Sequence, residues 1–246
     1  MKRLTILSGA IVAALATVAF VAAAPASATV LCQTIPKSEK GELVCSKPYG
    51  PGNISLTLKS GTKINFDGYG TLGEAEEAEN KELTEAEEEA AAAFTCNEGR
   101  YAGFLEKASA EISSVTFNKN GGKCDSKIFG AASVGYTALN LEYQSRFTWL
   151  KTTAPQGNFE IDELTKTAKM GFRLSLPKEE TCTYEALTRA LGSVINGSGE
   201  TPTTIKLKGG LFVWSKGSKL CPAFILSTAT FALKGAELSN LYLATK

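Results

Sequence analysis

Glu160, Asp162 and Glu163 form the most chemically suggestive cluster of side chains in this 246-residue sequence. The chain contains no histidine, which excludes Ser-His-Asp and Cys-His nucleophiles and every histidine-containing metal site. Paired carboxylates are the acid–base chemistry that remains, and on a strand Glu160 and Asp162 would share one face. The cluster therefore leaves open a carboxylate-based carbohydrate hydrolase. A polar outer strand face accounts for the same residues equally well.

Four aromatic residues, Tyr136, Tyr143, Trp149 and Trp214, are candidates for an exposed face that binds a sugar or a protein without catalysis. Most large aromatic side chains of a β-domain lie in its core, so core packing is the competing interpretation for each of them.

Two short motifs resemble catalytic or nucleotide sites. Residues 68–73 match G-x-G-x-x-G, but the helix expected after them opens with glutamates, which repel a pyrophosphate. Residues 60–63 match S-x-x-K, but they fall between two strand patterns, where a turn is expected. We therefore expect no cofactor and no metal.

The first 28 residues have the pattern of a secretory signal peptide. A basic start at Lys2 and Arg3 precedes a long apolar run that ends in a small-residue cleavage site after Ala28. An uncleaved membrane anchor is the alternative. Cleavage lowers the formal net charge from +1 to −1, so the mature chain, residues 29–246, has no basic excess for nucleic acid. We expect a secreted, extracellular protein with no membrane span after cleavage.

All six cysteines lie in this mature part. An even number in an exported chain predicts three disulfides, and fifteen pairings are formally possible. Spacings of 13, 28 and 39 residues favour sequential pairing. A zinc site is disfavoured because the sequence has no C-x-x-C. The preferred pairs are Cys32–Cys45, Cys96–Cys124 and Cys182–Cys221.

Alternation of apolar and polar residues recurs along the mature chain and predicts about ten short strands. Ser60-Gly61 lies between two such runs and predicts a hairpin. The fold class we expect is all-β, an antiparallel β-sandwich or a barrel-like domain. We expect one domain, with a possible internal boundary near residues 118–126.

Residues 74–93 interrupt this pattern. Nine glutamates and one lysine between 74 and 89, followed by four alanines, favour a surface helix. We expect an acidic helical insertion in a strand connection.

Short motifs around the cysteines resemble those of uncharacterised secreted proteins of soil actinobacteria of the Solirubrobacter type. This resemblance implies a secreted all-β domain with local disulfides, and it carries over no functional residues. The motifs are Leu31-Cys32, Phe94-Thr95-Cys96, Cys182-Thr183-Tyr184, Cys221-Pro222 and Leu226-Ser227-Thr228-Ala229-Thr230, with Leu241-Tyr242-Leu243 near the end.

These observations favour a secreted, non-enzymatic β-domain that binds a polymer, such as cell-wall polysaccharide, or a surface protein. The hydrolase is the first alternative, and a structural component of a surface assembly is the second.

Overall fold

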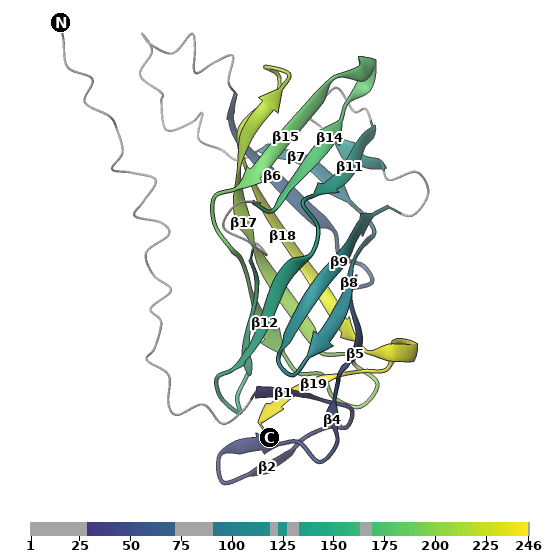
Figure 1. Ribbon diagram of the computed structural model, residues 1–246, viewed down its shortest axis with the longest axis vertical. Coiled ribbons are helices and arrows are strands. Elements are labelled where there is room, and N and C mark those ends of the chain that lie inside the picture. Colours follow the sequence, from purple (N-terminus) through teal and green to yellow (C-terminus); the bar gives the residue numbers. More distant parts are fainter. Residues whose placement is uncertain (1–28, 72–90, 119–122, 127–132, 163–168, 246) are drawn as a thin grey trace, which may run out of the picture.

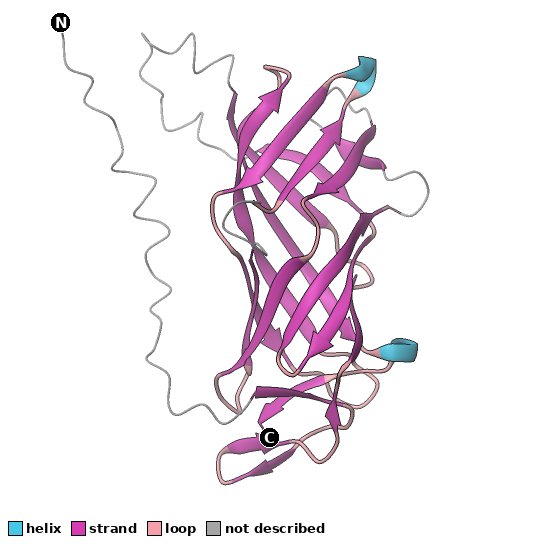
Figure 2. Cartoon of the chain, viewed as in Figure 1, coloured by secondary structure: helices cyan, strands magenta, loops and turns pink. Residues whose placement is uncertain are grey.

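The computed structural model describes residues 29–71, 91–118, 123–126, 133–162 and 169–245 of the chain. The described residues are almost entirely β-structure, with two short 3-10 turns, η3 (Pro177–Glu179) and η4 (Ala236–Leu238) (Figure 2). Among them, no helix has the length and apolarity needed to cross a membrane.

Fourteen strand segments close into one elongated barrel (Figure 1). All pairings between neighbouring segments are antiparallel. The segments are β5 (Gly52–Leu58), β6 (Ile64–Thr71), β7 (Ala91–Cys96), β8 (Gly99–Glu106), β9 (Ser109–Phe117), β10 (Lys123–Ser126), β11 (Ser133–Leu139), β12 (Tyr143–Trp149), β13 (Gly157–Asp162), β14 (Gly171–Ser175), β15 (Thr181–Ala186), β16 (Ala190–Ile195), β17 (Thr204–Gly217) and β18 (Pro222–Lys234).

The registers show that these segments make eight long strands, six of which are interrupted near their middle. β5 and β6, for example, lie end to end along β18, which pairs with Leu58 through Phe231 and with Asn65 through Thr228. β7 with β8, β9 with β10, β11 with β12, β13 with β14, and β15 with β16 are related in the same way, whereas β17 and β18 are continuous. The barrel is therefore an eight-stranded up-and-down meander, closed by β18 against β5 and β6.

The interruptions form a belt around the barrel, which we call the waist. A backbone hydrogen bond from Asn118 N to Glu98 O links two adjacent interruptions, and Leu187 N, in the interruption between β15 and β16, donates to Leu211 O on the continuous strand β17. Left-handed backbone conformations occur there, as at Asn140, where φ is 53°. Because these residues leave the regular ladder, the side chains on either side of the waist point into the barrel at irregular spacing.

The barrel decides between the two expected architectures and corrects two local predictions. Residues 59–63 do form a turn, with Thr62 N donating to Lys59 O, but β5 and β6 do not pair with each other, so the predicted hairpin is wrong. The predicted acidic helix falls mostly outside the described residues, and its expected end is wrong because residues 91–93 begin β7. Strands on both sides of residues 118–126 belong to the same closed barrel.

Aromatic rings fill much of the barrel interior, and inward-facing glycines leave the space that these rings occupy. Gly99 lies directly opposite Phe117, and Gly192 opposite Phe159. A Cβ added to Gly99 would come 2.8 Å from the Phe117 ring. Small and large residues thus alternate across the barrel, which lets an eight-stranded interior accommodate many rings.

A second, five-stranded sheet lies across the lower end of the barrel as drawn in Figure 1. Leu31 and Leu243 of this sheet belong to the main core. The Asn196 side chain fixes this sheet, because its Nδ2 donates to Leu243 O at 2.7 Å and its Oδ1 accepts from Leu243 N at 2.7 Å. The strands of this sheet are β1 (Thr29–Cys32), β2 (Lys37–Glu39), β3 (Glu42–Val44), β4 (Pro48–Tyr49) and β19 (Tyr242–Thr245).

Three disulfides tie the fold together, and their pairing confirms the sequential prediction. Because all six cysteines are bonded in this way, none remains for a zinc site. Three bonds of this kind indicate an oxidising environment. They join Cys32 to Cys45 in the small sheet, Cys96 to Cys124 between β7 and β10, and Cys182 to Cys221 at the upper end.

Candidate functional site

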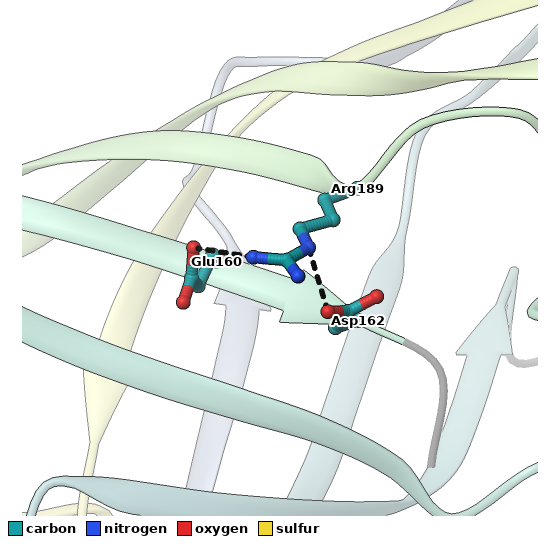
Figure 3. A network of polar contacts seen from close by, with 3 residues as sticks. All are labelled: Glu160, Asp162 and Arg189. Atoms are coloured by element: carbon teal, nitrogen blue, oxygen red, sulfur yellow. Dashed lines mark ion pairs between the residues drawn. The ribbon is translucent and has the colours of Figure 1, made fainter. Parts of the chain in front are cut away.

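The carboxylates Glu160 and Asp162 lie on the outer face of β13, where one arginine holds both (Figure 3). Arg189 Nε lies 2.7 Å from Asp162 Oδ2, and Arg189 Nη1 lies 3.9 Å from Glu160 Oε2. The Arg189 side chain is 59% exposed, so this is a surface ion pair of small energetic value. Glu163 lies outside the described residues.

This arrangement differs from that of a glycosidase. A glycosidase holds its two carboxyl groups on opposite sides of a scissile bond, with one of them kept protonated. Glu160 and Asp162 instead share one strand, one face and one guanidinium. Their geometry is that of the polar outer strand face considered above.

The four candidate aromatic residues point into the barrel and form no outer face. Tyr143 is only 3% exposed, and its hydroxyl donates to the carbonyls of Leu139 and of Gly171, the latter at 3.1 Å. Tyr136, Trp149 and Trp214 are half-buried and pack against the main core.

Two of the four converge with a third tyrosine at the waist. Tyr101 on β8 follows the interruption at residues 97–98, while Tyr136 and Tyr143 lie on either side of the interruption at 140–142. Burial raises the pKa of Tyr101 and of Tyr136 far above the usual value near 10, and the neighbouring phenols raise both further. Burial also raises the pKa of Tyr143 to about 12. The three phenols therefore stay protonated at neutral pH.

Aromatic neighbours fix the rings of Tyr101 and Tyr136. Phe117 contacts both, with ring centroids 5.9 Å from Tyr101 and 4.3 Å from Tyr136, edge to face in each case. Tyr101 also meets Phe231 at 5.2 Å and 89°, and Tyr136 stacks on Phe172 at 5.2 Å and 22°. Such contacts hold the rings in one orientation and so position their hydroxyls.

The hydroxyls of Tyr101 and Tyr136 differ from those of Tyr143 and Tyr184, because in the described part of the chain neither has a hydrogen-bond partner. Tyr143 donates to backbone carbonyls, and Tyr184 donates to Pro222 O at 2.9 Å. Among the described residues, two side-chain polar atoms are fully buried and have no hydrogen-bond partner. They are Thr183 Oγ1 and Trp214 Nε1. The Tyr101 and Tyr136 hydroxyls thus have no partner but are not fully buried, although their rings lie deep in the barrel. Both hydroxyl oxygens therefore keep some solvent contact, and we call these two residues the tyrosine site.

Comparison of the chain with family models, with curated proteins and with solved structures finds no match in any of the three. We therefore infer the function from the tyrosine site itself.

Tyr101 was missed by the sequence analysis, although a signal for it exists. It stands between Gly99 and Gly103 at every second position of β8, and a strand with such glycines leaves room for a large ring on the same face. Trp149 and Trp214 lie apart from the tyrosine site. Trp149 N bonds to Thr29 Oγ1 at the lower end, and Trp214 lies opposite Tyr184 in the upper half.

Proposed function

We propose that this chain is a non-enzymatic binding protein that acts outside the cytoplasm and holds a small, largely apolar ligand inside its barrel. The observation that carries the proposal is the pair of hydroxyls of Tyr101 and Tyr136, which have no hydrogen-bond partner among the described residues and whose rings pack among aromatic side chains. Small-molecule sites typically combine apolar walls with a few such polar groups.

The inward orientation of the aromatic residues favours a small ligand over a polymer or a protein. Binding of a polysaccharide depends on aromatic side chains that line an outer face, and Tyr136, Tyr143, Trp149 and Trp214 all point inward. Eight-stranded barrels enclose an interior that holds side chains and, in some cases, one small ligand. The hydrolase has less support, because Arg189 pairs with both of its carboxylates on the outer surface.

The place of action outside the cytoplasm is supported by two independent features. Residues 1–28 have the composition of a secretory leader, and three disulfides are stable in an oxidising compartment. The resemblance to secreted proteins of soil actinobacteria agrees with export, and a relationship to those proteins is part of the proposal.

The test is a screen of one-ring organic compounds against the purified, disulfide-bonded protein. A compound that binds the folded state raises the melting temperature by mass action. The variant Trp149→Phe leaves Trp214 as the single tryptophan, because the chain has only two, and Trp214 faces the barrel interior. We expect at least one compound to raise the melting temperature and to change Trp214 emission.

A variant that fills the interior locates the binding. Ala138 is half-buried, lies opposite Phe172 and points into the barrel, so Ala138→Leu should abolish the response to the compound. Thr137→Leu, at the neighbouring exposed position, is the matched control and should retain it. Equal binding to both variants, or no response to any compound, would refute the proposed function.

A further inference from the structure

Apolar side chains gather on the outer face of the upper half of the barrel, over β17 and β18 (Figure 1). Phe212 on β17 and Ile225 on β18 are buried in the core. Side chains alternate between the two faces of a strand, so the residues on either side of these two point outward. They are half-buried and apolar, and none belongs to the core or to the half-buried residues that pack against it. These outward-facing residues are Leu211, Val213, Phe224 and Leu226.

The strand registers join these side chains into one surface. Leu211 lies directly opposite Leu226, and Val213 lies directly opposite Phe224. Directly opposite side chains have Cβ atoms about 5 Å apart, so the four lie side by side. Leu187 extends the surface, because its N–H donates to Leu211 O and its side chain is 50% exposed. We call these five residues the outer patch. Contiguous apolar side chains on the outside of a protein mark an interaction site.

Four charged residues surround the outer patch. Glu185 on β15 and Asp67 on β6 flank it on opposite sides, across the strands. Lys208 and Lys216 lie on β17 at the two ends of the patch, along the strand. None of the four forms an ion pair within the described part of the chain. Burial also raises the pKa of the Asp67 carboxyl, as expected for a partly dehydrated carboxylate without a neighbouring cation.

The arrangement of these charges is complementary to itself when two patches meet with their strands crossed. The carboxylates lie at the sides of the patch and the lysines lie at its ends. A quarter turn between the two copies therefore places each carboxylate of one patch near a lysine of the other. Crossing at roughly 90° is one of the two common ways in which sheets pack face to face. With the strands aligned, lysines would instead face lysines.

We infer that a second copy of this chain covers the outer patch, in a two-fold symmetric dimer whose facing strands cross nearly at right angles. Such an interface uses the same surface on both copies, as the self-complementary charges require. The inference is independent of the ligand proposed for the barrel interior.

Sedimentation velocity of the purified, disulfide-bonded protein, over a wide range of concentration, tests the inference. We expect a reversible equilibrium between monomer and dimer. Leu226→Glu places a charge in the centre of the patch and should weaken the dimer about a hundredfold, as expected for the loss of a central contact. Phe104→Glu is the matched control, because Phe104 is 46% exposed on the outer face of β8, outside the patch, and it should leave the dimer unchanged.

Two charge-reversed proteins test how the copies face each other. One carries Asp67→Lys with Glu185→Lys, and the other carries Lys208→Glu with Lys216→Glu. Each should be monomeric alone, because like charges then surround both patches, and an equal mixture of the two should form a heterodimer. Circular dichroism and melting curves establish that every variant is folded.

Three results would each overturn the inference. The first is a wild-type protein that stays monomeric at every concentration, which would leave the outer patch to a different partner. The second is a dimer that Leu226→Glu and Phe104→Glu affect equally. The third is a mixture of the two charge-reversed proteins that stays monomeric. None of these results bears on ligand binding inside the barrel.

Discussion

Replacing single tyrosines by phenylalanine should separate hydroxyls that stabilise the barrel from those that do not. Tyr184 is fully buried, and its hydroxyl donates to Pro222 O at 2.9 Å. Tyr184→Phe removes that bond and leaves the carbonyl without this donor, which costs about 1 to 3 kcal/mol. Tyr101 and Tyr136 have no partner to lose in the described part of the chain. Tyr101→Phe and Tyr136→Phe should therefore change the free energy of unfolding by less than about 0.5 kcal/mol, or raise it.

Equilibrium unfolding in urea, with melting curves as a second measure, tests this prediction. For a chain of this size, each kcal/mol corresponds to about 2 to 4 °C in melting temperature. Each variant is compared with the wild-type protein in the absence of added ligand, with all three disulfides formed. If Tyr101→Phe or Tyr136→Phe destabilised the protein as much as Tyr184→Phe, those hydroxyls would have partners and the tyrosine site would be misassigned.

Three further predictions follow from the fold. Burial raises the pKa of four tyrosines, so the protein holds their protons more tightly when folded; the stability they contribute is complete below pH 10 and falls as the pH rises toward 12 and beyond. The free energy of unfolding falls by about 1.4 kcal/mol per pH unit for each group. Tyrosinate absorbance should therefore rise together with the loss of β-structure measured by circular dichroism. Ionisation of these tyrosines in a protein that is still folded would contradict the assignment. The four are Tyr101, Tyr136, Tyr143 and Tyr184. Gly157→Ala should destabilise the protein by about 2 kcal/mol in urea unfolding, because the added Cβ would lie 2.3 Å from Thr148 O and 2.2 Å from Leu243 Cδ2. An unchanged unfolding midpoint would show that Leu243 of the small sheet does not pack tightly against Gly157. Arg189→Gln should cost less than about 1 kcal/mol, because its ion pairs are exposed, and a larger loss would mean that they support the fold.

The sequence was sufficient to predict local features of the fold. Alternating residues indicated the strands, and the short spacings between cysteines favoured the disulfide pairs that the structure shows, because both signals act over a few tens of residues. The sequence did not predict which strands pair with each other. Residues 59–63 have the composition of a hairpin turn, yet Leu58 and Asn65 pair with β18, more than 160 residues away.

Tertiary contacts likewise override local preference at the end of the Glu/Ala segment. Residues 91–93 are alanines with high helix propensity, but they begin a strand that pairs with β6 and continues through Phe94 to the disulfide-bonded Cys96.

The candidate site was only partly predictable. Tyr136 and Tyr143 were selected for exposure and were found inside, because alternation shows that two residues share a face but not which face is buried. The glycines that flank Tyr101 indicate room for its ring, but its place beside Phe117 and Tyr136 follows from closure of the barrel, which brings β8 and β11 around Phe117.

The most direct test of the central claim is a nuclear magnetic resonance titration, into the protein, of a one-ring compound that raises its melting temperature, with the ring carbons bonded to the tyrosine hydroxyls isotopically labelled. The chain has seven tyrosines, so seven signals report on distinct places in the fold. Binding at the tyrosine site predicts that the Tyr101 and Tyr136 signals shift with a common affinity while the Tyr242 signal stays in place. Saturable binding that leaves the Tyr101 and Tyr136 signals unmoved would contradict the claim that the barrel interior holds the ligand.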